Sequence, residues 1–362
     1  MPKLIAFALL FLLQLTPYFV SIAAEPRQPE ITFLAVKDAK TVLLDESQEP
    51  YFSRMQPVEM VTKVGRPLTS VKLQAKQDEI RKEYAKSVMD YTDAEKKWLG
   101  DLVGEAQAIL SLSPHFTKTE WKFIKVASNI EGGLPHTRGD AIVFSEGLLK
   151  KFAEGLGASN PAAKQFIKRK LIQLLVHEQM HVLQRQQPKL FKKLYAAWGF
   201  EKAKKVELGE WLTRRQMLNP DGLELDWVYK EGGKKYLPMV VLKRTDGVPR
   251  MPHDFQTIAV ELEATSPGNY KAKLSQKKEK DGVPVPLFVA IPELTDFCKQ
   301  FGIPALSGYG YHPNEIAANL MQNLGYYKKT LKKEDYETQA TKIQASGMEN
   351  VSRFIEWLEP VK

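Results

Sequence analysis

Apolar residues recur at helical spacing between residues 160 and 187. Asn160 followed by Pro161 is typical of a helix N-cap and first helical position, where proline sacrifices no hydrogen bond. The run ends before Pro188. Its periodic positions are Phe166, Ile167, Leu171, Leu174, Leu175, Glu178, His181 and Val182. The pattern predicts one long helix with two ionisable residues on its inward stripe.

Further helices are predicted on both sides of this segment. Thr92-Asp93-Ala94-Glu95 is a capping box, and an amphipathic pattern follows it to Leu110. The charged stretch 72–86 is also expected to be helical. Shorter helical patterns cover residues 148–152, 190–198, 292–301, 313–324 and 349–358.

Short strands are predicted between the helices. The expected strands cover residues 31–36, 41–44, 121–127, 141–144, 226–229, 236–242 and 255–262. Asn219-Pro220-Asp221-Gly222 predicts a turn, and Gly232-Gly233 predicts the turn of a hairpin. The charged run 271–280 is expected to be a connection. Helices mixed with short antiparallel strands indicate the α+β class.

The first 24 residues have the pattern of a secretory signal peptide. Lys3 precedes an apolar run, Leu4–Leu13, that is too short to span a bilayer, and Ser21–Ala24 supplies small residues for cleavage. We therefore expect a secreted or periplasmic protein with no stable transmembrane anchor after cleavage. An uncleaved N-terminal anchor is the alternative.

The amino-acid composition excludes some kinds of binding site. The single cysteine, Cys298, excludes an internal disulfide and a cysteine-rich metal cluster. The net charge of +9 comes from basic clusters on predicted helix surfaces, which are expected to be solvated but could favour an anionic envelope surface. No nucleic-acid-binding motif is present, so no nucleic-acid partner is expected.

The long predicted helix contains His177-Glu178-Gln179-Met180-His181, an H-E-x-x-H motif. Residues four apart lie on one face of a helix, so both imidazoles can bind one ion. Glu178 can then act as a general base toward a water molecule. This combination is typical of a zinc hydrolase, because two neutral imidazoles and a carboxylate base are what such a site needs. A pair of buried histidines satisfied by their neighbours is the alternative.

A catalytic zinc site needs a third protein ligand. His312-Pro313-Asn314-Glu315, with Asn319 four residues later, resembles the second-helix motif of the gluzincin (zincin-like) metallopeptidases. That resemblance implies that Glu315 is the third zinc ligand and that Asn319 hydrogen-bonds the outer nitrogen of a ligand histidine. It also implies a zincin-like fold with a short antiparallel sheet, the H-E-x-x-H helix and a second helix bearing the glutamate.

The segment 135–144 occupies the position that the edge strand beside the active-site cleft has in zincins. An edge strand can pair with an extended peptide, so Ala141, Ile142 and Val143 are expected to bind substrate. An ordinary sheet edge is the alternative. On the resemblance, residues 91–362 form the catalytic domain, with a β-rich insertion at about 219–290, and residues 25–90 form an N-terminal extension, a propeptide or an accessory region.

Several assignments stay open on the sequence. The long gap between His181 and Glu315 leaves other candidates for the third ligand, and His312 is favoured as a helix cap instead. Tyr309 and Tyr311 are candidates to stabilise the oxyanion, with Tyr311 as the predicted catalytic partner of Glu178. The other candidate ligands are Glu207, Glu210, Glu261, Glu263 and His312.

These features together predict an exported zinc metallohydrolase, most simply a peptidase that acts on peptides or proteins. A non-catalytic envelope or binding protein that retains the scaffold is one alternative, and a zinc amidase acting on a cell-wall amide is another.

Overall fold

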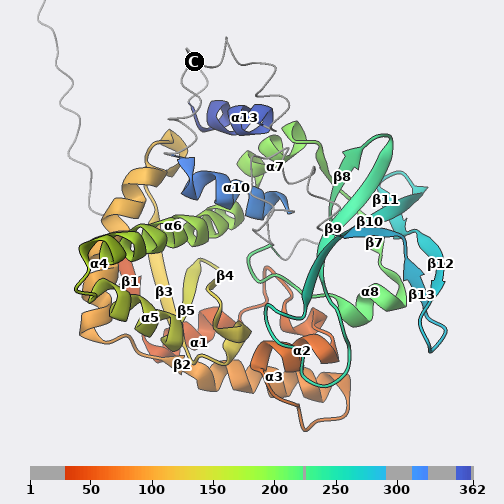
Figure 1. Cartoon of the computed structure of the whole chain (residues 1–362), viewed down its shortest axis with the longest axis horizontal. Coiled ribbons are helices and arrows are strands. Elements are labelled where there is room, and N and C mark those ends of the chain that lie inside the picture. Colours follow the sequence, from red (N-terminus) through yellow and green to blue (C-terminus); the bar gives the residue numbers. More distant parts are fainter. Residues whose placement is uncertain (1–28, 223–225, 291–311, 325–347, 360–362) are drawn as a thin grey trace, which may run out of the picture.

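The N-terminal half of the chain is built on a five-stranded sheet (Figure 1). The computed structural model describes residues 29–222, 226–290, 312–324 and 348–359. The sheet order is β1-β3-β5-β4, and β2 also pairs with β3. The strands are β1 (Glu30–Phe33), β2 (Val88–Met89), β3 (Glu120–Val126), β4 (His136–Arg138) and β5 (Ala141–Ser145).

This sheet is mixed, not antiparallel. β1, β3 and β5 run parallel, while β2 and β4 are antiparallel to their neighbours. The expectation of a short antiparallel sheet, which the resemblance implies, is therefore wrong for this part of the molecule. The reason is topological: helices separate β1 from β3, and the chain between β3 and β5 is long enough to return to the same end of the sheet.

Local sequence signals position the first helices. The two arms of the capping box join Thr92 and Glu95 at the start of α4, as predicted. The predicted strand at 41–44 is wrong, because these residues continue α1. The buried residues Ala39 and Leu43 are four apart, which is the helical period. The helices are α1 (Val36–Leu44), α2 (Pro57–Val64), α3 (Leu73–Ser87), α4 (Asp93–Leu110) and α5 (Glu146–Leu156).

Residues 29–90, the described part of the N-terminal region, are integrated into the first sheet. Strand β1 pairs with β3, and β2 pairs with the other end of the same strand. Helix α2 packs against a short 3-10 turn, η3 (Ile130–Gly133). The described part of the N-terminal region thus belongs to the same folded unit as the H-E-x-x-H helix.

A second, seven-stranded sheet comes after the motif helix in the chain (Figure 1). Its order is β6-β8-β9-β10-β11-β7, with β14 also pairing with β10. The predicted hairpin about Gly232-Gly233 is confirmed as β8 and β9. The strands are β6 (Phe200–Lys202), β7 (Lys205–Glu207), β8 (Trp227–Glu231), β9 (Lys234–Leu242), β10 (Phe255–Ser266), β11 (Asn269–Ala272) and β14 (Phe288–Ala290).

The charged run 271–280 is not a simple connection. Residues 271 and 272 end β11, and β12 (Leu274–Lys278) pairs with β13 (Pro284–Pro286). Lys273 pairs with Glu261, and Lys271 with Glu263, so the charges lie along neighbouring strands. The many charged residues of this run therefore belong to strands of a solvated hairpin and not to an irregular connection.

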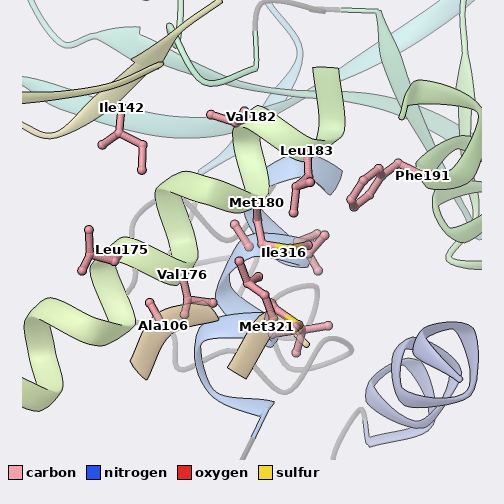
Figure 2. Packing of buried hydrophobic residues seen from close by; sticks show 14 of the residues in the cluster. Ala106, Ile142, Leu175, Val176, Met180, Val182, Leu183, Phe191, Ile316 and Met321 are labelled. Atoms are coloured by element: carbon pink, nitrogen blue, oxygen red, sulfur yellow. The ribbon is translucent and has the colours of Figure 1, made fainter. Parts of the chain in front are cut away.

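The motif helix α6 (Pro161–Gln186) packs against both α4 and α10 (Pro313–Gln322), and these two helices also contact each other. Figure 2 shows Val176 and Met180 of α6 beside Ile316 and Met321 of α10, all of them fully buried. This packing fixes the distance between the two helices that carry the predicted zinc ligands. The remaining helices are α7 (Pro188–Ala197), α8 (Gly209–Arg215) and α13 (Met348–Leu358).

The predicted signal peptide at 1–24 and the predicted helix at 292–301 fall outside the described residues. Within the ranges that the structure describes, no helix is both long and apolar enough to span a membrane.

Candidate metal centre

His177, His181 and Glu315 converge at the contact between α6 and α10. The two Nε2 atoms are 3.1 Å apart, and Glu315 Oε2 lies 3.3 Å from His177 Nε2. Glu315 Oε1 lies 3.7 Å from His181 Nε2. A tetrahedral zinc site with ligand distances of about 2.0–2.1 Å needs its ligand atoms about 3.3–3.4 Å apart. One ligand atom from each of the three residues lies within 4.8 Å of the other two, so His177, His181 and Glu315 could together hold one metal ion.

The start of α10 explains why Glu315 points at the histidines. His312 is the N-cap of this helix: its Nδ1 accepts a hydrogen bond from the Asn314 N–H at 3.3 Å. Pro313 occupies the first helical position, so Glu315 falls in the first turn. The cap role favoured for His312 is confirmed, and His312 is not part of the three-residue cluster.

A glutamine fixes the tautomer of His181. The Gln184 amide donates to the Asn314 carbonyl at 2.8 Å, so its Oε1 faces His181 Nδ1 at 2.9 Å. Because Oε1 can only accept, Nδ1 carries the proton, and the Nε2 lone pair is directed toward the cluster. Gln184 thus holds His181 ready to bind a metal and joins α6 to α10. Sequence reasoning missed this residue.

The role predicted for Asn319 is wrong. Its side-chain amide donates to the Glu315 backbone carbonyl at 2.9 Å and accepts from Gln322 at 2.8 Å. Both hydrogen bonds of the Asn319 side chain are therefore made within α10, and neither reaches a histidine of α6. The carboxylate of Glu315 is instead bonded by Asn219, whose Nδ2 lies 2.5 Å from Oε1.

The other candidate ligands are engaged elsewhere. All four glutamates form ion pairs with lysine or arginine, and none belongs to the metal cluster that the described residues form. The pairs are Glu207–Lys205, Glu210–Arg214, Glu261–Lys234 and Lys273, and Glu263–Lys271. Tyr309 and Tyr311 lie outside the described residues.

The electrostatics of the cluster suit metal binding. Burial lowers the pKa of His181 to about 4, so its imidazole is neutral at neutral pH. Burial alone would raise the pKa of Glu315, but the adjacent His181 and His177 bring it down to about 2. The neutral imidazole of His181 and the ionised carboxylate of Glu315 therefore face each other, and each is in the form that binds a metal.

Glu178 has the opposite environment. Burial, followed by the nearby charges of Asp221 and Glu315, raises the pKa of its carboxyl well above the usual range. Its Oε2 is buried and has no hydrogen-bond partner among the described residues. Glu178 lines the same cavity as His177 and Glu315. The side chain is thus free to take or give a proton there.

The cavity beside the cluster has a volume of about 290 Å³ and lies between the two sheets. Its wall is largely apolar, with Leu174 from α6, Val240 from β9 and Phe255 from β10. The other apolar lining residues are Leu134, Pro135, Met217, Leu218, Pro220 and Met251.

The predicted substrate-binding strand is not a sheet edge. Strand β5 pairs with β3 on one side and with β4 on the other, and Ala141, Ile142 and Val143 are fully buried. These three residues therefore have no free backbone groups on a sheet edge, and the substrate role given to them is wrong. The outer strand is β4, whose residues lie within the segment 135–144 but before the strand that the sequence predicts at 141–144.

The outer edge of β4 is also occupied. Asp221 Oδ1 accepts hydrogen bonds from the Thr137 N–H at 2.5 Å and from its hydroxyl at 2.7 Å. Arg185 donates to the same hydroxyl at 2.6 Å and also bonds the Pro220 carbonyl. A peptide cannot pair with Thr137 while Asp221 holds this position.

A buried ionic cluster holds the segment that carries Asn219 and Asp221. Glu59 accepts from the Leu218 N–H at 2.6 Å, and Lys63 donates to the Leu218 carbonyl at 2.9 Å. Lys63 also pairs with Glu131 at 2.8 Å. Burial raises the pKa of Glu59 to about 7, against the opposing effect of Lys63. Helix α2 thereby fixes both residues beside the metal cluster.

Comparison of the chain with protein-family models, with curated proteins and with solved structures found no match.

Proposed function

We propose that this protein is an exported, zinc-dependent metallohydrolase of gluzincin type, and that it is a peptidase. The observation that supports the proposal best is the convergence of His177, His181 and Glu315 from two helices, with the unpaired carboxylate oxygen of Glu178 on the same cavity. A metal site with a structural role alone would not need that base.

The residues have distinct tasks in this proposal. His177, His181 and Glu315 would hold zinc, which when bound supplies Lewis acidity and lowers the pKa of water. Glu178 would accept a proton from the attacking water and return it to the leaving amine. The raised pKa of its carboxyl favours the second of these transfers. Export rests on the signal pattern of residues 1–24.

A peptide-library digest tests the proposal. The zinc-loaded protein should cleave peptides, a chelator should abolish cleavage, and Glu178→Gln should reduce turnover by about two or more decades while zinc content persists. Glu154→Gln is the matched control, because Glu154 is exposed on α5.

The other outcomes would contradict the proposal in different ways. Loss of zinc from Glu178→Gln would make Glu178 a ligand or a structural partner. Bound zinc without cleavage of any peptide would favour a binding protein or an amidase that acts on another amide.

A further inference from the structure

The cavity beside the metal cluster is electronegative, although the chain as a whole carries a charge of +9. Its described lining contains four carboxylates, Glu131, Glu178, Asp221 and Glu315, and one ammonium, Lys63. Lys63 is paired with Glu131. The other three acidic side chains, Glu178, Asp221 and Glu315, form no ion pair with a lysine or arginine of the described residues. A ligand with a positive charge is therefore favoured over a neutral or anionic one.

His136 supplies an unused acceptor on the same wall. Its Nδ1 lies 3.2 Å from the Leu134 carbonyl and must carry the proton, because a carbonyl can only accept. His136 is one of the residues that line the cavity, and its buried Nε2 has no hydrogen-bond partner among the described residues. Burial lowers the pKa of His136, so the ring is neutral at neutral pH. A buried lone pair of this kind needs a donor from a ligand or from water.

Asp221 supplies a second acceptor. Both hydrogen bonds from Thr137 go to Oδ1, and Oδ2 has no partner among the described residues. The guanidinium of Arg185 lies nearby, but it is engaged by Glu49, Thr137 and the Pro220 carbonyl. The unused polar atoms of His136 and Asp221 are thus both hydrogen-bond acceptors.

We propose that this cavity binds the primary ammonium group at the N-terminus of a peptide, together with an apolar first side chain. The ammonium donates to His136 Nε2 and to the Asp221 carboxylate, and the side chain packs against Leu174, Val240 and Phe255. The inference rests on the proposed function and makes the protein an aminopeptidase. It also agrees with the closed edge of β4, because a terminal residue can enter the cavity without pairing as a strand.

Three small amides test the inference by isothermal titration of the zinc-loaded full chain. Leucinamide should bind at least about tenfold more tightly than N-acetyl-leucinamide, because acetylation removes the charge and two donors. It should also bind more tightly than N-acetyl-lysinamide, whose ammonium lies on a side chain. Equal binding of leucinamide and its acetylated form would overturn the proposal, as would preferred binding of the lysine compound.

Variants of His136 make the test residue-specific. His136→Phe should reduce the preference for the free amine about tenfold, whereas His136→Gln should retain part of it by keeping an acceptor. His115→Phe is the control, because His115 is exposed and does not line the cavity. An unchanged preference in His136→Phe would remove His136 from the site.

These titrations do not require turnover, so the two proposals can fail separately. A preference for the free amine in a protein that cleaves no peptide would refute the peptidase assignment alone. Cleavage of N-acetylated and free peptides at equal rates would refute the amine site alone.

Discussion

Gln184 should control zinc affinity although it does not contact the metal position. In Gln184→Leu, the Nδ1–H of His181 loses its acceptor, and the proton is free to move to Nε2, where it blocks metal binding. Loss of such a partner typically weakens metal binding by about 10- to 100-fold, which is about 1.4–2.7 kcal/mol. The same substitution removes the bond to the Asn314 carbonyl and so loosens α10 from α6.

Gln173→Leu separates these two effects. Gln173 also joins the two helices, through a 3.0 Å hydrogen bond to Asn323, but it does not touch a ligand histidine. Competition with a chromogenic chelator at neutral pH should show a loss of about 10-fold or more for Gln184→Leu and less than about 3-fold for Gln173→Leu. Equal losses would show that the helix bridge matters and the tautomer does not.

The metal ligands, the buried support and the cavity wall can each be tested by substitution. Glu315→Ala should lower zinc affinity steeply and His312→Ala far less, measured by chelator competition, and the reverse order would exchange their roles. Burial raises the pKa of Glu59 from 4.5 to about 7, so the folded state binds the proton of this carboxyl more tightly than the unfolded state does. Proton binding to Glu59 therefore contributes on the order of 3 kcal/mol to stability at low pH, and this contribution is lost as the pH rises through 7. Urea unfolding at several pH values should therefore show that the free energy of unfolding of Glu59→Gln rises relative to that of the wild type between pH 5 and pH 8. The same pH dependence of stability in both proteins would refute this. Val240→Ala should shift cleavage toward bulkier apolar residues, whereas Val241→Ala, on the opposite face of β9, should lower stability without changing preference.

The parts of the candidate site that the sequence predicts are local in the chain. The H-E-x-x-H spacing, the Asn160 cap and the Pro313 start each depend on residues within one or two helical turns. Helical geometry then fixes where His177, Glu178 and Glu315 lie on their helices. The meeting of the two helices can be anticipated only through the resemblance, because no local pattern specifies which helices pack together.

The errors concern contacts between distant segments. The sequence identifies Asp221 only as part of a turn, yet this residue bonds Thr137, which is 84 residues away. The parallel register of β1, β3 and β5 likewise depends on pairings that alternation along one strand cannot reveal. Asn319 shows the converse problem: its spacing from Glu315 is correct for one helical face, but its amide bonds its own helix.

The buried contacts of α2 bear on the propeptide hypothesis for residues 25–90. A propeptide must be removable without loss of the catalytic fold, but Glu59 and Lys63 together bond both backbone groups of Leu218. The next residue, Asn219, bonds the carboxylate of Glu315. Removing α2 would take the ammonium of Lys63 away from the buried carboxylate of Glu131 and would free the segment that orients a predicted zinc ligand. We therefore propose that the described part of this region is retained as a support of the His177, His181 and Glu315 cluster.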